Sequence, residues 1–393
     1  MIINERYLET EPTYRFELLA PKERILFYDI ETTGLSMAKA SMYLIGAVFF
    51  EDGRWKLRQF FAESLYDETK LLEGFFGLVN ERKRLGRVFL VSYNGDGFDL
   101  PFLKGCLRQY GLPYDFTGTF SLDLLKKVRP YRKLTGLSDC RLKTVEKLCG
   151  IEREDRYSGG ELIYVYEEYL RLSGLDPESC ENTELNRKLK DELLRTLLLH
   201  NAEDILDMPL IMDVLAYESL FDGGFTVTES AVSGGVWDIH AKLDTALPKG
   251  IYRETAEYVL SISEEDPLEL NLAVTLYEGE LKNFYTDYKN YYYLPAEDYA
   301  IHKSVGEYVD KKARRQATAR NCYQRVKGTF VPQPEAIFPP MFYREYKVLP
   351  GYGKLPGDTA LNGGMMDAEV TRRYLNAVLK DLKSEAAAEK KRS

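Results

Sequence analysis

Three short apolar runs near the start of the chain are typical of β-strands. The run from Arg24 to Ile30 is bounded by Pro21 and by Thr32–Gly34, which predicts a central strand. The runs 43–50 and 55–61 are joined by an Asp-Gly pair, which favours a hairpin turn between them. The folded part of the chain therefore begins with three strands.

Helical periodicity follows this hairpin. Apolar residues recur three and four positions apart over residues 67–84, which predicts a helix, and the run 88–92 predicts a fourth strand. A second helix is expected over 100–110, ending at Gly111, and a fifth strand over 116–122. Strands that alternate with helices are typical of an α/β fold.

The pattern changes close to residue 223. A helical repeat over 184–220, interrupted at Pro209, ends at two glycines, and long alternating runs then predict a β-rich region. Residues 367–383 have the pattern of an amphipathic terminal helix. We therefore expect an N-terminal extension over 1–22, an α/β domain over 23–222 and a β-rich accessory domain over 223–393.

Composition narrows the class of protein. The chain has 393 residues, 45% hydrophobic and 29% charged, which is a globular balance. It shows no apolar run of membrane-spanning length, a charged start where a signal peptide needs an apolar run, and five cysteines without a CxxC pair. We therefore expect a cytoplasmic protein with no membrane partner.

Charge and tyrosine are unevenly distributed. The net charge of −9 argues against coating of nucleic acid through bulk charge, yet residues 303–354 hold eleven Lys or Arg against four Asp or Glu. Nine of the 29 tyrosines lie between Ile251 and Ala300. Aromatic rings with positive charge suit single-stranded nucleic acid, whereas half-buried tyrosines of a β-rich core are the commoner case, and both interpretations stay open.

Two carboxylates end the central strand. Asp29 and Glu31 are two residues apart, so both side chains project from the same face. A strand this apolar rarely keeps two carboxylates without a cation to offset their repulsion. Asp99 follows a turn that contains Gly95 and Gly97, and this position allows it to face the first pair.

A histidine and a fourth carboxylate lie further along the chain. Asp204 follows His200 by four residues on a predicted helix, so the two side chains share one face. Carboxylates bind Mg²⁺ or Mn²⁺, and two such cations can clamp the attacking and leaving oxygens of a phosphodiester. A nearby imidazole can take a proton from the attacking water or orient it.

Each of these residues also has a purely structural interpretation. Asp29 can cap a turn, Asp99 can cap a helix, and His200 can lie on the surface. Asp123 is expected to be a helix cap rather than a site residue, and Asp96 a solvated turn residue. The combination favours a functional site, because a motif as long as DIETTGL rarely occurs by chance.

These motifs resemble the DEDD superfamily of DnaQ-like 3′ to 5′ exonucleases. The first motif, DxE followed by TTGL, matches Asp29–Leu35, and the second, NxxxFD, matches Asn94–Asp99. The resemblance covers roughly residues 24–215 and implies a ribonuclease-H-like fold with a mixed five-stranded sheet flanked by helices. It implies that Asp29, Glu31, Asp99 and Asp204 bind two divalent cations, Mg²⁺ or Mn²⁺. It also implies nucleic-acid contacts from Thr32, Thr33, Gly34, Leu35, Asn94 and Phe98.

The third motif departs from the better-known histidine pattern. HNAED places three residues between His200 and Asp204, which is the spacing of the tyrosine type, so His200 occupies the usual tyrosine position. This form is similar to a predicted bacterial exonuclease branch of ribonuclease-H-like proteins. A role as general base and a role in orienting water therefore both remain open for His200.

The function expected from the sequence is a bacterial metal-dependent 3′ to 5′ exonuclease that acts on a single-stranded 3′ end, with DNA as the first substrate. One alternative is an RNA exonuclease or a structure-specific endonuclease, since a linear motif does not report on recognition of the 2′-hydroxyl. Another is a nucleic-acid-binding module whose nuclease core is inactive.

Overall fold

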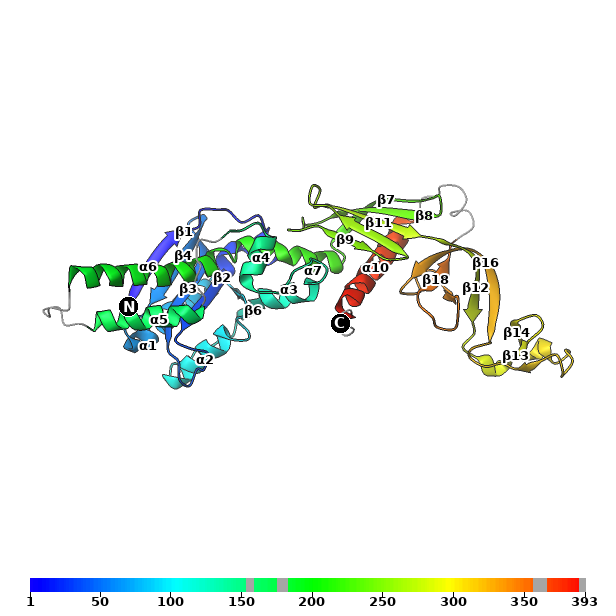
Figure 1. Ribbon diagram of the computed structural model, residues 1–393, viewed down its shortest axis with the longest axis horizontal. Helices are drawn as coiled ribbons and strands as arrows, with labels where there is room; N and C mark the ends of the chain where they lie inside the picture. Colours follow the sequence, from blue (N-terminus) through cyan, green and yellow to red (C-terminus); the bar gives the residue numbers. More distant parts are fainter. Residues whose placement is uncertain (153–158, 175–182, 356–365, 389–393) are drawn as a thin grey trace. The chain divides into compact units, whose positions relative to one another are not determined.

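The computed structural model describes residues 1–152, 159–174, 183–355 and 366–388. The chain divides into two compact units (Figure 1). Unit 1 comprises Met1–Arg132 and Leu137–Leu215, and unit 2 comprises Lys133–Gly136 and Ala216–Ser393. None of the helices in the described part of the chain combines the length and the apolar character that crossing a membrane requires.

Unit 1 is built around a mixed sheet with the strand order β1-β4-β3-β2-β5-β6. The central strand β2 pairs antiparallel with β3 and parallel with β5, and β5 pairs parallel with β6. The expected α/β fold with a mixed sheet is confirmed. The strands are β1 (Ile2–Tyr7), β2 (Ile25–Thr32), β3 (Met42–Glu51), β4 (Arg54–Phe61), β5 (Val88–Ser92) and β6 (Thr119–Asp123).

The sheet has six strands, and the expectation of five was wrong by one. The additional strand, β1, lies in the segment expected to be an extension, and it pairs antiparallel with β4 from Ile2↔Phe61 to Tyr7↔Lys56. It is an edge strand with most of its side chains exposed, so it carries no apolar periodicity. A pattern of hydrophobic positions therefore does not reveal it.

Helices cover this sheet. Helix α1 packs against β3, β4 and β5, while α6 contacts β2, β3 and β4, and α5 lies beside α6 in Figure 1. Helix α6 ends three residues before Pro209, where the sequence predicted a break, and a 3-10 turn follows. The helices are α1 (Glu68–Lys83), α2 (Asp99–Gln109), α3 (Leu124–Val128), α4 (Leu142–Leu148), α5 (Gly159–Ser173), α6 (Glu184–Leu206) and α7 (Leu215–Phe221), the last of which crosses the boundary between the units.

The two faces of β2 contribute to different parts of the core. Leu26 and Tyr28 belong to one buried cluster, and Ile25 and Phe27 to another. This division follows from the alternation of side chains along a strand. Both faces of the central strand are therefore buried, which explains why its sequence is nearly continuous in apolar residues.

Unit 2 is rich in β-structure and ends in a helix, as the sequence predicted. Its largest sheet has the order β7-β8-β11-β10-β9, and helix α10 (Ala368–Ala388) contacts β7 (Figure 1). The ring centroids of Tyr374 on α10 and Trp237 on β8 lie 4.5 Å apart. The strands of this sheet are β7 (Phe225–Ser233), β8 (Val236–Leu243), β9 (Ile251–Glu254), β10 (Tyr258–Ile262) and β11 (Glu269–Thr275).

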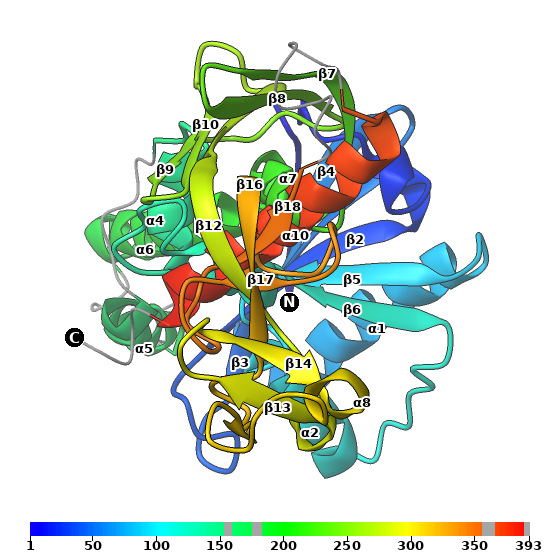
Figure 2. The same cartoon turned by 90° about the vertical axis from the view of Figure 1, so that its right-hand side faces the viewer.

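A small closed barrel and a three-stranded sheet complete unit 2. The barrel has the order β12-β16-β18-β17, and the sheet the order β14-β13-β15. Figure 2 shows strands β13 and β14 near one end of the long ribbon formed by β12 and β16. The strands are β12 (Tyr277–Phe284), β13 (Tyr291–Leu294), β14 (Tyr299–His302), β15 (Arg315–Gln316), β16 (Tyr323–Gln333), β17 (Phe342–Tyr343) and β18 (Gly351–Lys354).

Candidate active site

The end of β2 places two carboxylates above the buried core. Asp29 and Glu31 continue the face of β2 on which Phe27 is buried, because alternate residues of a strand share a face. Ala202 and Ile205 of α6 pack into the same cluster as Phe27. The C-terminal part of α6 is thereby held against the face that carries both carboxylates.

Asp99 reaches the same strand from α2. The turn between β5 and α2 contains Asn94 with a φ of 66°, and α2 begins at Asp99 itself. The Asp99 carboxylate is buried and accepts a hydrogen bond of 3.1 Å from the backbone N–H of Ile30. The pairing of β2 with β5 stops at Phe27, so this amide lies beyond the parallel ladder and is available to Asp99.

Helix α6 contributes the histidine and the last carboxylate. The buried His200 has its Nε2 atom 3.7 Å from Glu31 Oε1 and 3.7 Å from Asp204 Oδ2. One ligand atom from each of these three residues lies within 4.8 Å of the other two. Carboxylate oxygens and an imidazole nitrogen this close together fit the donor set of a divalent cation.

The electrostatics of the four carboxylates also fit a cation. Burial raises the pKa of Asp29 well above its ordinary value, and the neighbouring charges of Asp99, Glu31 and Asp204 raise it further. Burial likewise raises the pKa of Asp99 to about 7, against the lowering effect of the hydrogen bond from Ile30. Carboxylates in such surroundings resist ionisation unless a positive charge is supplied.

Asn201 was not identified in the sequence as a site residue. Its side chain is fully buried, and its Nδ2 atom donates to Asp29 Oδ2 at 3.0 Å. Its Oδ1 atom accepts from Gln59 Nε2 at 2.9 Å, and Gln59 Oε1 accepts from Asn4 Nδ2 at 2.9 Å. This chain of amides fixes the orientation of the Asp29 carboxylate.

One glycine makes room for this contact. Asp29, Gly46 and Gln59 are neighbours across β2, β3 and β4. A Cβ atom on Gly46 would lie 2.3 Å from Asn201 Oδ1, so only glycine lets the amide cross β3 between the two strands. The position of Asn201 within HNAED is the one signal in the sequence, and it gives no indication of which residue the amide contacts.

The expected nucleic-acid contacts lie at the end of β2 and in two loops. Thr33 closes the loop after β2, because its backbone N–H donates to Ser41 O and its Oγ1 accepts from Ser41 N, both at 2.9 Å. Thr32 Oγ1 donates to the carbonyl of Gly34 at 2.8 Å, and the side chain of Leu35 is 87% exposed.

The second loop holds the other two expected contacts. Asn94 is exposed, whereas Phe98 is half-buried against Phe102, with ring centroids 5.7 Å apart. Asp123 accepts hydrogen bonds from Asn94 N at 2.9 Å and from Leu125 N at 3.0 Å, so it caps α3 and supports this turn. Asp96 pairs with Lys126 at 2.5 Å. Asp123 therefore has the capping role that the sequence favoured, whereas Asp96, expected to be a solvated turn residue, is paired with Lys126.

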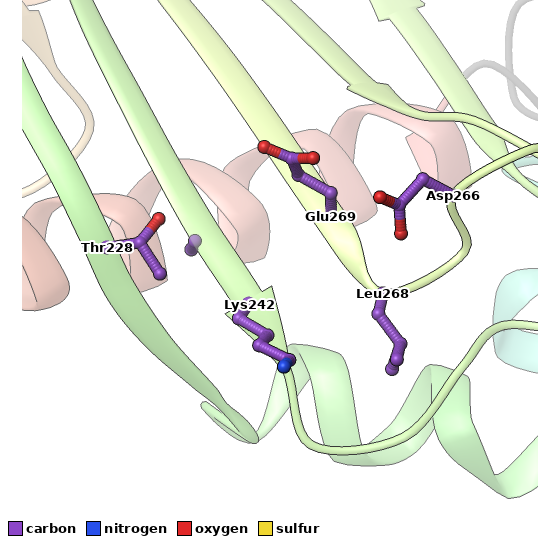
Figure 3. Close-up of a pocket in the computed structure, with 6 residues that line it drawn as sticks. Thr228, Lys242, Asp266, Leu268 and Glu269 are labelled. Carbon is purple, nitrogen blue, oxygen red and sulfur yellow. The ribbon is translucent and has the colours of Figure 1, made fainter.

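Two cavities are lined by residues other than the four carboxylates. One of about 420 Å³ in unit 2 is lined by the exposed strand residues Thr228, Lys242 and Glu269 together with Asp266 (Figure 3). The other, of about 650 Å³ in unit 1, follows α2 from Lys104 to the turn at Gly111 and is closed by aromatic residues. Neither is lined by the residues of the candidate active site.

Comparison with known proteins identifies the first unit. The sheet of this order, with carboxylates from β2, α2 and α6, lies in a unit of ribonuclease-H-like fold. Residues 26–216, just under half of the chain, match the model of the RNase_H superfamily. The resemblance expected from the motifs is confirmed at this level. No curated protein is similar enough to count as a match.

Solved structures give weaker matches. A zinc-bound complex of E. coli ExoI with single-stranded DNA is 14% identical over 61% of this chain and 54% of that chain, with a TM-score of 0.27. E. coli exonuclease I in complex with an oligonucleotide is 13% identical over 61% and 54%, with a TM-score of 0.26. The chain thus matches about half the length of these proteins, and TM-scores this low do not show a shared fold.

Proposed function

We propose that the protein is a metal-dependent 3′ to 5′ exonuclease that hydrolyses single-stranded nucleic acid, with DNA as the first candidate. The observation that carries this proposal is the convergence of Asp29, Glu31, Asp99 and Asp204 from three separate elements onto one end of β2. Such a site repels a polyanionic substrate unless cations are bound, so the carboxylates are suited to hold two Mg²⁺ or Mn²⁺ ions. When bound, these ions supply Lewis-acid stabilisation of the attacking and leaving oxygens.

The side chains of the site have distinct roles in this proposal. Asp29, Glu31, Asp99 and Asp204 would hold the cations, and Asn201 orients Asp29. His200 lies beside Glu31 and Asp204, where it orients the attacking water or takes its proton. Attack of that water on the terminal phosphodiester breaks the bond to the 3′ oxygen of the preceding nucleotide and releases a nucleoside 5′-monophosphate.

The two loops beside the site hold the end of the strand. The exposed Leu35 side chain offers an apolar surface to a terminal base, while the exposed Asn94 offers hydrogen-bonding groups. Phe98 is half-buried and supports the second loop through Phe102. These contacts favour an unpaired end, because a base must leave its stack before it can pack against Leu35.

A time course with 5′-labelled DNA and RNA strands of one sequence tests the proposal. The assay compares Mn²⁺, Mg²⁺ and EDTA for the wild-type protein, Asp29→Asn and a control, Glu73→Gln, which changes an exposed carboxylate on α1. We expect a metal-dependent ladder that shortens from the 3′ end, present in the control and absent in Asp29→Asn. Internal cuts would support the endonuclease alternative. Faster degradation of the RNA strand would identify RNA, rather than DNA, as the preferred substrate.

A wild-type protein that binds both strands and cleaves neither, with any of the metals, would overturn the proposal in favour of an inactive binding module. If Asp29→Asn hydrolysed the strand at the wild-type rate, Asp29 would not be part of the catalytic site. Melting temperatures of the variants establish whether a loss of activity reflects the chemistry or the fold.

A further inference from the structure

A small module of unit 2, residues 285–325, contains most of the nine tyrosines that lie between Ile251 and Ala300. Strands β13, β14 and β15 and the short helix α8 (Lys303–Gly306) surround a core of Ala300, Ala317 and Cys322. The tyrosines packed around this core are Tyr285, Tyr288, Tyr291 and Tyr293. These four tyrosines are therefore structural, and the binding interpretation depends on tyrosines outside this core.

The module presents positive charge that acidic residues in the described part of the chain neutralise only in part. Residues 311–334 hold seven Lys or Arg and no Asp or Glu. Arg325 pairs with Glu280 and Asp298. By contrast, the four exposed cations of residues 311–320 form no ion pair with any residue that the structure describes, and they are Lys311, Lys312, Arg315 and Arg320.

An exposed aromatic ring lies beside this basic segment in the sequence. The side chain of Tyr308, which follows α8, is 92% exposed. Arg314 donates to the carbonyl of Gly306 and lies over the ring of Tyr292, 4.4 Å from its centroid, so the basic segment is tied to the end of α8. The nearby acidic residues are Glu307 and Asp310. Asp310 accepts the backbone N–H of Lys312, which turns the chain at this point.

We propose that Tyr308 and the four unpaired cations form a binding surface for single-stranded nucleic acid, separate from the carboxylates of unit 1. Each cation can neutralise a phosphate, and the exposed ring can stack with a base that is free of its own partner. A paired duplex keeps its bases inside and offers no face to Tyr308. The kinetic consequence rests on the proposed function, because a second contact on the same strand keeps that strand bound between cleavage events.

Binding by the full-length Asp29→Asn protein tests this surface without hydrolysis. Anisotropy of a labelled oligothymidylate is measured in EDTA over a range of salt concentrations. The test variant replaces Lys311, Lys312, Arg315 and Arg320 with Gln. The control replaces four exposed cations elsewhere in unit 2, namely Lys242, Lys249, Arg373 and Lys380. Both variants lose the same total charge. A difference between their affinities therefore shows that the position of the cations matters.

We expect the test variant to bind about tenfold or more weakly than the control. The slope of log affinity against log salt should fall by about 2.8, because each phosphate contact to a single strand contributes roughly 0.7. Equal affinities and slopes for the two variants would overturn the proposal. An unchanged DNA affinity together with competition by polyglutamate at the test surface would instead identify an acidic protein partner and would also overturn it.

Tyr308 supplies an independent test. Tyr308→Ala should weaken binding of the oligothymidylate about fivefold or more, while Tyr308→Phe keeps the ring and should bind like the parent protein. Equal binding of a blunt duplex and a single strand would contradict the stacking role. Failure of the proposed exonuclease would look different, because the wild-type protein would then be inactive while the binding difference between test and control variants persisted.

Discussion

The imidazole of His200 lies at equal distances of 3.7 Å from a carboxylate oxygen on β2 and one on α6. These distances are longer than hydrogen bonds and leave the Nε2 atom between two groups that are expected to hold cations. His200 occupies the position that carries tyrosine in the related motif type, and an imidazole has a basic ring nitrogen, which a phenol lacks. The presence of histidine in place of tyrosine is therefore expected to affect proton transfer at the site.

Replacement of His200 tests this role. We expect His200→Gln to lower the single-turnover rate of strand cleavage by about 10²- to 10⁴-fold, the usual contribution of a positioned acid or base. The acidic limb of the pH–rate profile should flatten in the variant if the imidazole takes a proton. A slower reaction with an unchanged pH profile would assign it to orienting water, and an unchanged rate would remove it from the site.

The raised pKa of Asp99 predicts how the metal-free protein responds to pH. Its pKa is about 7 in the folded protein, mainly because of burial, and near 3.9 in an unfolded chain. The folded state therefore holds a proton that the unfolded state loses between these values, and the stability of the fold falls as pH rises from about 4 to about 7.

Thermal unfolding in EDTA at several pH values measures this effect. Asp99→Asn keeps an oxygen to accept the N–H of Ile30 but does not titrate. We expect the variant to melt at a higher temperature than the wild type at pH 8, with the difference shrinking toward pH 5. A difference that stays constant with pH would contradict the assignment of the shift to Asp99.

At the scale of elements, the site depends on how closely α6 approaches the sheet. The carboxylates of β2 face α6 because alternation puts them on the face of Phe27, and Ala202 and Ile205 bury α6 against that face. Within the helix, Asn201 reaches over β3 to join Gln59 on β4 with Asp29 on β2. Gly46 is the residue that permits this approach.

Gly46→Ala should displace the amide of Asn201 and disconnect it from Asp29 and Gln59. We expect a loss of about 1 to 3 kcal/mol in the free energy of unfolding, since a buried amide loses its partners, together with a slower cleavage rate. The matched control is Gly77→Ala on α1, where a Cβ atom meets nothing within 4 Å. That change should instead stabilise the helix by about 0.5 to 1 kcal/mol. Similar stabilities for the two variants would contradict the packing role of Gly46.

At the scale of the whole molecule, the candidate cation ligands all belong to unit 1, whereas the basic surface belongs to unit 2. A ligand that binds only the folded state stabilises the part of the protein that holds it. Hydrogen exchange with and without Mn²⁺ separates the two units on this basis.

We expect Mn²⁺ to increase protection in β2, at the start of α2 and in the C-terminal half of α6, and to leave the sheets of unit 2 unchanged. Glu31→Gln should remove this protection, because it deletes a ligand that faces His200 and Asp204. Equal protection of β7 to β11 would place a metal site in unit 2, and no change in unit 1 would contradict the cation site.

The amino-acid sequence by itself determined strands β2 to β6 and helices α1, α2 and α6 of unit 1. The apolar run of β2, the Asp-Gly hairpin and the periodicity of α1 are local patterns, and local patterns follow from steric and burial preferences of neighbouring residues. The sequence also identified Asp29, Glu31, Asp99 and Asp204 as candidate site residues, because each lies in a short contiguous motif. Strand β1 was not predicted, because an exposed edge strand needs no alternation of apolar and polar residues.

Only the tertiary structure decided which of these residues meet. The contacts of Asn201 with Gln59 and Asp29 join residues 142 and 172 positions apart, and no local pattern encodes such a distance. The same holds for unit 2, where burial around Ala300, Ala317 and Cys322 separates the structural tyrosines from the exposed Tyr308. Side-chain identity is a property of the chain, whereas burial and the partners of each polar group are properties of the packed fold.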